Sequence, residues 1–267
     1  MITSRNHPQI RAFRRLLTRK GRQDSGSFIA EGIRQVTTLI ESPYVVETLI
    51  VAPDLLASAT AWDVVARHRS GGGTCLMVSA DVFASISVRE NPQGLAAVAS
   101  SGIRRLDEVD ASTRRLWVAL IDPQDPGNVG TIARTCDAVG AAGIILIGNA
   151  VDPYHPRSIR ASVGAVFTQE IVTCSGGDLV AWSRANELPL VGTSDTADLD
   201  YRQLPSTREM VLVMGSERQG IPDAMRTHLD SVVRIPMSGS CDSLNLAVAT
   251  SVILYEIAYG KARREAV

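Results

Sequence analysis

Three separated stretches of this chain place glycines and uncharged polar residues directly after apolar runs. They extend from Asp122 to Gly140, from Val211 to Pro222 and from Arg234 to Ala249. Ligands of an open parallel sheet usually bind where loops leave the carboxyl ends of the strands. In such loops, glycine lets the backbone approach a ligand, while hydroxyl and amide groups hydrogen-bond to it. We therefore expect a polar ligand site assembled from three loops that are distant in sequence.

The first stretch contains two polar residues that could take part in a reaction, Asn128 and Arg134. A helix over Asn128–Val139 would bury an apolar stripe and place Arg134 on the opposite side, roughly 9 Å along the axis from Asn128. Taken alone, Arg134 is typical of a solvated side chain and Asn128 of an ordinary helix N-cap. Neither residue by itself distinguishes a reaction site from a surface helix.

The other two stretches add Glu217, Ser243 and Asn245. Glu217 lies in a glycine-rich loop just beyond an apolar strand, although a simple turn before a helix would have the same composition. Ser243 and Asn245 open a run that is apolar over most of its surface and predicts a buried helix. A buried Asn245 needs hydrogen-bond partners for its amide, whether its role is chemical or structural.

The pattern after Arg115 alternates apolar strands with helices, which is typical of an α/β fold with a parallel sheet covered on both faces. The predicted strands are Leu116–Ile121, Gly143–Ile147, Glu170–Thr173, Leu190–Thr193, Met210–Met214 and Val232–Ile235. The predicted helices are Asn128–Val139, Arg157–Val163, Asp178–Glu187, Pro222–Leu229 and Ser243–Tyr259. We expect a smaller α/β domain over residues 1–103, with one element over Ser27–Leu39, then a linker over 104–115 and the larger domain over 116–267.

Charge is distributed unevenly along the chain. The formal net charge is −1, but the first 34 residues hold eight basic residues against Asp24 and Glu31, so they carry +6 and the remainder −7. A basic arm of this kind suits a polyanion, although a solvated helix with excess charge gives the same pattern. The candidates for contact with a polyanion are Arg5, Arg14, Arg15, Arg22 and Arg34.

Several function classes find no support in the sequence. Four scattered cysteines, without a C-x-x-C pair or a histidine at ligand spacing, indicate neither a zinc site nor a disulfide framework. They favour a reducing, cytoplasmic compartment, and no apolar stretch approaches the length of a membrane span. The fingerprints of dinucleotide-binding proteins, P-loop NTPases and α/β-hydrolases are missing. We therefore expect neither a metal nor a membrane partner.

The order and spacing of the three stretches resemble the signature blocks of the SpoU/TrmH family, RNA 2′-O-ribose methyltransferases of the SPOUT superfamily. The resemblance extends from Leu116 to about Gly260. It implies a deep trefoil knot that holds S-adenosylmethionine in a bent conformation, and a homodimer whose active site draws on both subunits. Cofactor contacts are implied at Thr193, Gly215, Ile235, Met237 and Leu244.

The same resemblance implies roles for the polar candidates, because N-x-G-x-x-x-R (Asn128 to Arg134) lines the reaction site in the family. Asn128, Ser243 and Asn245 would hydrogen-bond the ribose or fix Arg134, and Glu217 would orient the cofactor loop or a basic residue of the partner. The position of Arg134 is that of a general base in the family, yet guanidinium is hardly ever deprotonated in proteins. We expect Arg134 mainly to bind the phosphate beside the target ribose and to lower the pKa of the 2′-hydroxyl.

The N-terminal part resembles the RNA-binding accessory domain of the family. Its landmarks are Ser4 to Pro8, Phe28 to Gly32 and Asn91 to Gly94. Such a domain favours ribosomal RNA, in particular 23S rRNA, over tRNA, and some relatives protect the ribosome against an antibiotic. Three alternatives stay open: a tRNA 2′-O-methyltransferase, a non-catalytic RNA-binding paralogue, and a nucleotide-binding oxidoreductase of ordinary winding.

Overall fold

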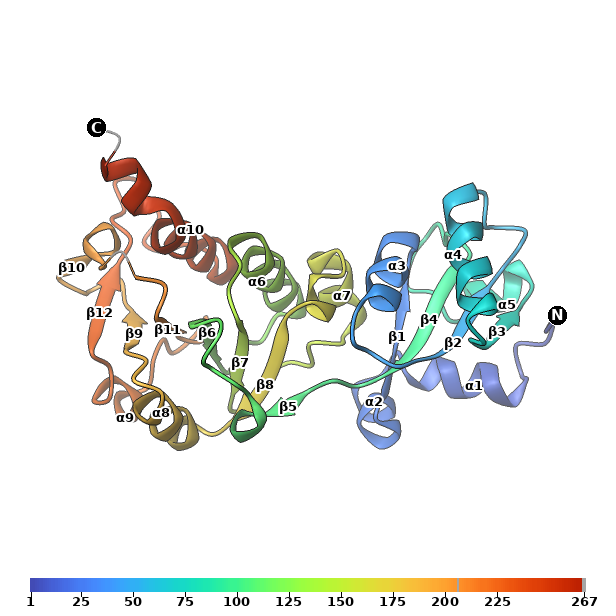
Figure 1. Ribbon diagram of the computed structural model, residues 1–267, viewed down its shortest axis with the longest axis horizontal. Coiled ribbons are helices and arrows are strands. Elements are labelled where there is room, and N and C mark those ends of the chain that lie inside the picture. The colour runs from blue at the N-terminus through green and yellow to red at the C-terminus, as the bar shows by residue number, and fades with distance from the viewer. Residues whose placement is uncertain (206, 266–267) are drawn as a thin grey trace. The chain divides into compact units, whose positions relative to one another are not determined.

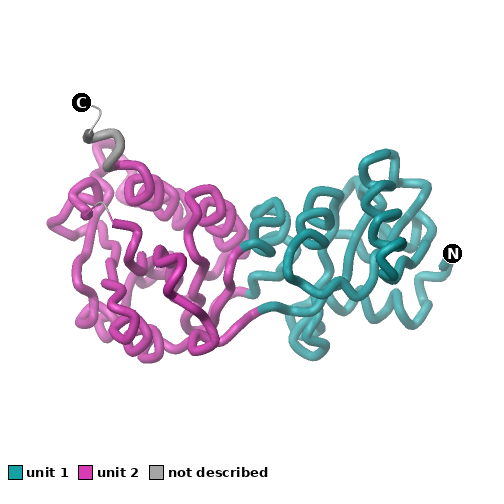
Figure 2. The backbone as a smooth tube through the Cα atoms, in the orientation of Figure 1, with its two compact units in different colours: residues 1–102, 152–168 teal, residues 103–151, 169–267 magenta. Residues whose placement is uncertain are grey.

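The computed structural model describes residues 1–205 and 207–265, which form two compact units (Figures 1 and 2). The first unit contains residues 1–102 and 152–168, and the second contains 103–151 with the described residues from 169 onward. The chain therefore passes between the units three times. The segment 152–168, which the sequence assigned to the larger domain, packs with the N-terminal unit instead.

The first unit is built on a four-stranded sheet in the order β1-β4-β2-β3. Its strands are β1 Ser27–Glu31, β2 Val46–Val51, β3 Cys75–Met77 and β4 Leu95–Ser100. Both β1 and β2 pair antiparallel with β4, while β3 runs parallel to β2. Its helices are α1 Pro8–Arg15, α2 Arg19–Ser25, α3 Ile33–Glu41, α4 Ala59–Ser70, α5 Ala80–Ala84 and α7 Pro156–Ser162, with a 3₁₀ turn at Ala165–Phe167.

The single element expected over Ser27–Leu39 is corrected to a strand followed by a helix, β1 and α3. The break falls at Gly32, whose φ of +114° lies where residues with a side chain are strained. A Cβ at this position would also come within 2.5 Å of the Arg89 guanidinium and of the Gln35 amide oxygen. The turn therefore favours glycine chiefly for its backbone conformation, since the two side chains could move aside.

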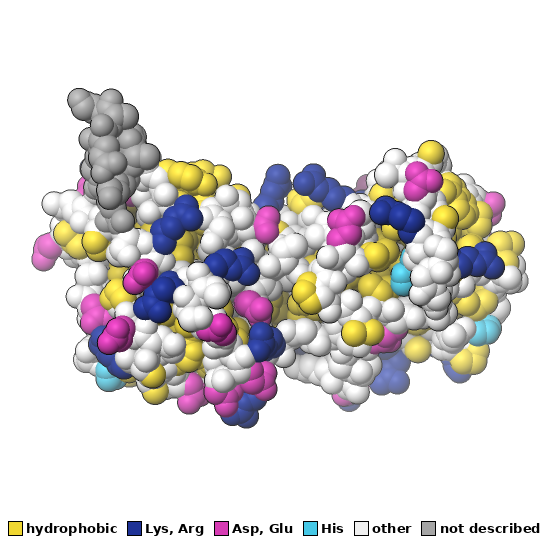
Figure 3. Space-filling model, in the orientation of Figure 1, with side chains coloured by type: hydrophobic (Ala, Val, Ile, Leu, Met, Phe, Trp, Pro, Cys, Tyr) yellow, Lys and Arg dark blue, Asp and Glu magenta, His cyan; other side chains and the backbone are white. Residues whose placement is uncertain are grey.

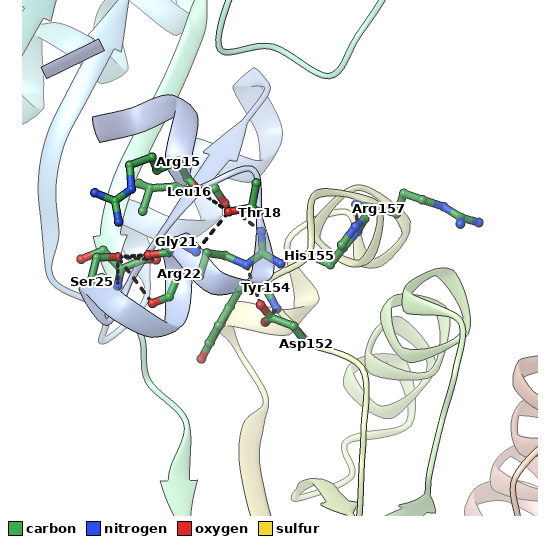
Figure 4. A network of polar contacts seen from close by, with 11 residues as sticks. Arg15, Leu16, Thr18, Gly21, Arg22, Ser25, Asp152, Tyr154, His155 and Arg157 are labelled. Carbon is green, nitrogen blue, oxygen red and sulfur yellow. Dashed lines mark hydrogen bonds and ion pairs between the residues drawn. The ribbon is translucent and has the colours of Figure 1, made fainter. Parts of the chain in front are cut away.

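A network of polar contacts joins the segment 152–168 to the rest of the first unit (Figure 4). The Nε of Arg22 donates to Asp152 Oδ2 at 2.5 Å, and its Nη1 donates to the Leu16 carbonyl at 2.7 Å. Nearby, the hydroxyls of Tyr44 and Tyr154 lie 2.7 Å apart, and the Tyr154 ring stacks on Phe28 with centroids 4.4 Å apart. Ion pairing and aromatic packing thus hold this segment in the N-terminal unit.

The second unit contains an eight-stranded sheet in the order β10-β12-β9-β11-β6-β7-β8-β5, and all its pairings are parallel. The strands are β5 Arg104–Arg105, β6 Leu116–Ile121, β7 Gly143–Ile147, β8 Glu170–Cys174, β9 Leu190–Thr193, β10 Leu199–Asp200, β11 Met210–Met214 and β12 Ser231–Arg234. The helices are α6 Pro126–Val139, α8 Gly176–Ala185, α9 Asp223–Arg226 and α10 Leu246–Glu265, with 3₁₀ turns at Leu106–Glu108 and Tyr201–Gln203.

Helices cover both faces of this sheet, with α6 and α10 on one face and α8 and α9 on the other (Figure 1). The central strands β6, β7 and β11 are buried at every position, as near-continuous apolar runs require. The predicted α/β class and parallel sheet are confirmed. The trefoil knot stays a prediction, because the order of the strands does not establish how the chain is threaded.

Three expected boundaries change in the structure. The segment predicted as a linker contains β5, which extends the sheet by pairing with β8, and Leu106 after it is buried. The helix expected over Pro222–Leu229 shrinks to α9, and the last helix begins at Leu246 instead of Ser243. In the described part of the chain, no helix combines the length and apolar character that crossing a membrane requires.

Candidate functional site

A cavity of about 580 Å³ opens where β9, β11 and β12 end. These strands are neighbours in the sheet, so their carboxyl ends deliver three loops to one place. The residues that line it are Thr193, Ser194, Asp195, Met214, Gly215, Ser216, Glu217, Gly220, Arg226, Val233, Ile235, Met237, Asp242, Ser243, Leu244, Asn245, Leu246, Ala249 and Ile253. The expectation of a site built from loops distant in sequence matches this arrangement, except that the first stretch does not line the cavity.

The loop after β11 is a tight turn that only glycine permits at its ends. A Cβ on Gly215 would lie 2.3 Å from the carbonyl carbon of Gly220, and Gly220 itself has φ +64°. Reciprocal backbone hydrogen bonds of 3.0 Å between Ser216 and Gly220 close the turn. Glu217 at the second position of the turn is thereby held at the edge of the cavity.

Three polar candidates from the three stretches form one chain of hydrogen bonds. The Nδ2 of Asn245 donates to Asn128 Oδ1 at 3.0 Å, and the Nδ2 of Asn128 donates to Glu217 Oε1 at 2.9 Å. At the other end, Asn245 Oδ1 accepts from the backbone N–H groups of Ala247 and Val248, so Asn245 caps α10. The structure therefore brings Asn128, Glu217 and Asn245 together.

The helix N-terminus fixes the direction of every bond in this chain. Backbone N–H groups can only donate, so the amide oxygen of Asn245 must face α10 and its Nδ2 must face Asn128. The Asn128 oxygen therefore accepts from Asn245, and its Nδ2 donates to the Glu217 carboxylate, which can only accept when it is ionised. The second oxygen of that carboxylate has no hydrogen-bond partner within the described residues and remains available to a ligand.

Two expectations for these residues are corrected. Asn128 is the third residue of α6, because Asp125 is the N-cap and accepts from the Gly127 N–H at 2.7 Å. Asn245 is exposed and not buried, since it precedes the first turn of α10. The amide partners that a buried Asn245 would need are nevertheless present.

The remaining two chemical candidates lie apart from this chain. Ser243 lines the cavity, and its hydroxyl donates to Asp242 Oδ1 at 3.1 Å. Arg134 is exposed on α6, and no described residue forms an ion pair or a hydrogen bond with its guanidinium. It does not line the cavity. At the next residue of α6, Thr135 Oγ1 lies 2.8 Å from Ser251 Oγ and links α6 to α10.

All five residues expected to contact the cofactor line the cavity: Thr193, Gly215, Ile235, Met237 and Leu244. The volume is in the range of ligand pockets, roughly 300–1,000 Å³. Apolar side chains such as Met214 and Leu246 could cover a nucleobase, while Ser194 and Asp195 offer acceptors for hydroxyl groups. The cavity therefore fits a nucleoside that carries a charged tail, as S-adenosylmethionine does.

Several residues of the cavity carry no functional signal in the sequence, notably Met214, Arg226 and Leu246. Met214 ends a strand and Leu246 opens a helix, so both looked like core residues. Arg226 lies in the short helix α9, where a lone arginine carries no signal. Only the folding of α9 against the loop after β11 brings Arg226 to the cavity.

The five arginines expected to contact a polyanion differ in their surroundings. Arg5 and Arg15 are exposed, with ion pairs to Asp81 at 3.6 Å and to Asp24 at 3.5 Å. Arg14 is half-buried and donates to the Ser85 carbonyl and hydroxyl at the end of α5. The remaining members of the set are Arg34, which is exposed, and Arg22.

Arg22 is corrected from an RNA contact to a structural residue. Its side chain is 4% exposed and its guanidinium is occupied by Asp152 and Leu16 (Figure 4). On the face seen in Figure 3, the cations of the first unit are scattered and do not gather in one patch.

The cysteines behave as structural thiols. Burial raises the pKa of both Cys136 and Cys174 to about 12, so both are protonated at neutral pH. Cys241 is exposed beside the cavity residue Asp242. Within the described residues, no group of three or more His, Cys, Asp or Glu side chains is arranged to hold a metal ion.

Both parts of the chain match known protein families. Residues 115–255 match the model of the SpoU rRNA Methylase family, and residues 7–97 match the MRM3-like substrate binding domain. A 23S rRNA (uridine(2479)-2′-O)-methyltransferase of Streptomyces viridochromogenes is 33% identical over 96% of this chain and 90% of its own. The 23S rRNA (guanosine(2553)-2′-O)-methyltransferase RlmP of Bacillus subtilis is 28% identical over 96% and 98%.

Solved structures agree with these matches. The AdoMet-bound rRNA methyltransferase from Sinorhizobium meliloti superimposes with a TM-score of 0.87 at 33% identity, covering 100% of this chain and 98% of that one. The SpoU methyltransferase AviRb from Streptomyces viridochromogenes, also in complex with AdoMet, gives a TM-score of 0.87 at 30% identity over 96% and 99%. Both similarities span the two units of the chain.

Proposed function

Because this chain belongs to the SpoU rRNA methylase family, we propose that it methylates a ribose 2′-oxygen of ribosomal RNA with S-adenosylmethionine as the methyl donor. The observation that carries the proposal is the hydrogen-bonded chain Asn245–Asn128–Glu217 at the edge of a cavity that fits the cofactor. The reaction would take place in the cytoplasm, where ribosomes are found. Protection against an antibiotic stays a prediction.

The sulfonium of S-adenosylmethionine supplies an activated methyl group. The residues of this chain must then hold the 2′-hydroxyl in line with that methyl and ease the loss of its proton. Asn128 is held by two partners, one of which, Glu217, lines the cavity, and Ser243 lines it directly, so both are placed to orient a ribose hydroxyl. A guanidinium in contact with the neighbouring phosphate would lower the pKa of the hydroxyl, which is the role that we propose for Arg134.

We propose that the enzyme is a homodimer in which α10 lies at the interface. Val248, Tyr255 and Tyr259 are about half exposed and follow one another along the helix at intervals of seven and four residues. Hydrophobic side chains are visible on the surface of this helix in Figure 3. A partner subunit would cover them and would supply surroundings for Arg134. Light scattering at micromolar concentration tests this, and a monomer would contradict it.

Ribosomal RNA is the substrate that we propose over tRNA. The first unit matches a substrate-binding domain, and two relatives that match nearly the whole chain are named as 23S rRNA methyltransferases. One modifies a uridine and the other a guanosine, so the shared fold does not specify the base. We therefore expect the target to be recognised largely through the shape of the RNA.

The proposal is tested by incubating the protein with radiolabelled S-adenosylmethionine and unmodified 23S rRNA. We expect label at one nucleotide, mapped as a 2′-O-methyl stop, and loss of that label in Arg134→Ala. Label on tRNA instead would show that tRNA, and not ribosomal RNA, is the substrate. RNA binding without any label would favour the non-catalytic RNA-binding protein and would overturn the enzymatic role.

A further inference from the structure

The cavity is lined by more acidic than basic side chains. Three acidic residues, Asp195, Glu217 and Asp242, and one arginine, Arg226, line it. Arg226 is the sole cation among the described residues that line the cavity. A ligand that leaves these charges balanced must carry more positive than negative charge, and it must present its anionic group to Arg226.

Arg226 is held in place by a backbone hydrogen bond and forms no ion pair with a described residue. Its Nε donates to the Ile221 carbonyl at 2.9 Å, which fixes the plane of the guanidinium. One terminal nitrogen, Nη2, lies 4.0 Å from the point where a Cβ of Gly220 would be, so it lies beside the loop after β11. No described carboxylate forms an ion pair with Arg226, although three line the same cavity. Its two terminal nitrogens are therefore available for a bidentate contact.

We propose that Arg226 binds the carboxylate of the methionine part of S-adenosylmethionine. This inference rests on the proposed function, since it assigns one end of the cofactor to one residue of the cavity. The cofactor carries a single carboxylate together with an ammonium and a sulfonium, so it has one net positive charge. One guanidinium and three carboxylates are complementary to that distribution.

The same charge balance favours binding of S-adenosylmethionine over binding of the product S-adenosylhomocysteine. Methyl transfer removes the positive charge of the sulfur, so the remaining S-adenosylhomocysteine is neutral overall. A cavity with an excess of carboxylates attracts the cationic cofactor more strongly than the neutral product. Release of the product is thereby eased, while the Arg226 contact to the carboxylate is common to both molecules.

An RNA phosphate is the other anion that Arg226 could meet. The surroundings argue against it, because three carboxylates in the same cavity repel a polyanion. A single carboxylate on a small zwitterion avoids most of that repulsion, since its own ammonium lies beside it. The two ligands are separated by measuring the affinities for the cofactor and for RNA independently.

The test is calorimetric titration of the wild type, Arg226→Met and Arg218→Met with S-adenosylmethionine and with its decarboxylated form. Arg218 is the matched control, because it is an exposed arginine on the neighbouring loop that does not line the cavity. We expect Arg226→Met to bind S-adenosylmethionine about tenfold more weakly, the size of a partly exposed charge-assisted contact. Its affinity for the decarboxylated form, a dication without a carboxylate, should be no weaker than that of the wild type, which also shows that the cavity is intact.

Other outcomes would overturn the inference. An equal loss with both ligands would mean that Arg226 only supports the loop after β11. Unchanged affinity for S-adenosylmethionine together with weaker RNA binding would assign Arg226 to a phosphate. If the wild type did not bind S-adenosylmethionine, the proposed function would fail as well. If the wild type and Arg226→Met bound it equally well, only the proposed role of Arg226 would be wrong.

Discussion

Two polar networks in this molecule each join segments that are far apart in sequence, yet they differ in exposure. In the first unit, Arg22 and Asp152 pair across 130 residues with side chains 4% and 12% exposed. In the second unit, the chain Asn245–Asn128–Glu217 lies at the edge of a cavity and ends in an exposed carboxylate. A buried network holds a fold together, whereas an exposed one keeps hydrogen-bonding capacity for a ligand.

The direction of the hydrogen bonds sharpens this difference. Near Arg22, the hydroxyl of Tyr154 contacts that of Tyr44 and accepts from the Gly102 N–H, under a stack of aromatic rings. Near Asn128, the N-terminus of α10 dictates that amide donors point toward Glu217. We therefore expect substitutions in the first network to change stability and substitutions in the second to change turnover.

The largest expected effect is that of Arg22→Ala on stability. Removing one partner leaves Asp152 buried and unpaired, which costs about 3–5 kcal/mol of the free energy of unfolding. Urea titration followed by circular dichroism measures this. Arg15→Ala is the control, because its side chain is 71% exposed and its loss should cost less than about 0.5 kcal/mol. Equal losses in the two variants would contradict the structural role of Arg22.

Asn128→Asp should come next, with an effect on turnover. The new carboxylate still accepts from Asn245 but can no longer donate to Glu217, and it adds like-charge repulsion. We expect methyl transfer in a single turnover to fall about 10²–10³-fold, as for loss of one oriented donor. Asn149→Asp makes the same chemical change at an exposed position outside the hydrogen-bonded chain and should leave turnover nearly unchanged. A fully active Asn128→Asp would show that the network has no catalytic role.

A third expectation concerns high pH. Burial raises the pKa of the Tyr154 hydroxyl well above 10, and the neighbouring Tyr44 adds to the shift. Its contribution to stability is therefore complete below pH 10 and declines as the pH rises further, by at most about 1.4 kcal/mol per pH unit. Unfolding free energies measured at pH 9 and pH 11 should fall more steeply for the wild type than for Tyr154→Phe. Parallel pH profiles would show that Tyr154 ionises normally.

The smallest expected effect is that of Thr135→Val, which removes the hydroxyl between α6 and α10. Loss of one partly buried hydrogen bond to Ser251 should cost about 1 kcal/mol of unfolding free energy. Thr131→Val provides the comparison, because Thr131 is exposed and bonds only within its own helix through the Gly127 carbonyl. If both variants were equally stable, the contact between α6 and α10 would not depend on this pair.

The sequence by itself determined the parallel sheet and two of the three loops at the cavity, those after β11 and β12. Apolar runs and glycines are local signals, so β6, β7, β9 and β11 and the glycine-rich turn at Gly215 follow from neighbouring residues. Resemblance to a family, rather than periodicity, indicated Thr193, Ile235 and the other cofactor positions, all of which line the cavity. Their contact with the cofactor itself remains a prediction.

Only the tertiary structure decided which polar residues meet. Nothing near Arg22 in the sequence distinguishes it from Arg15, because its partner Asp152 lies 130 residues later. The capping role of Asn245 depends likewise on where α10 begins, and the approach of Arg226 to the cavity depends on how α9 packs. Local patterns specify elements, whereas burial and ion pairing depend on long-range contacts that no short stretch of sequence encodes.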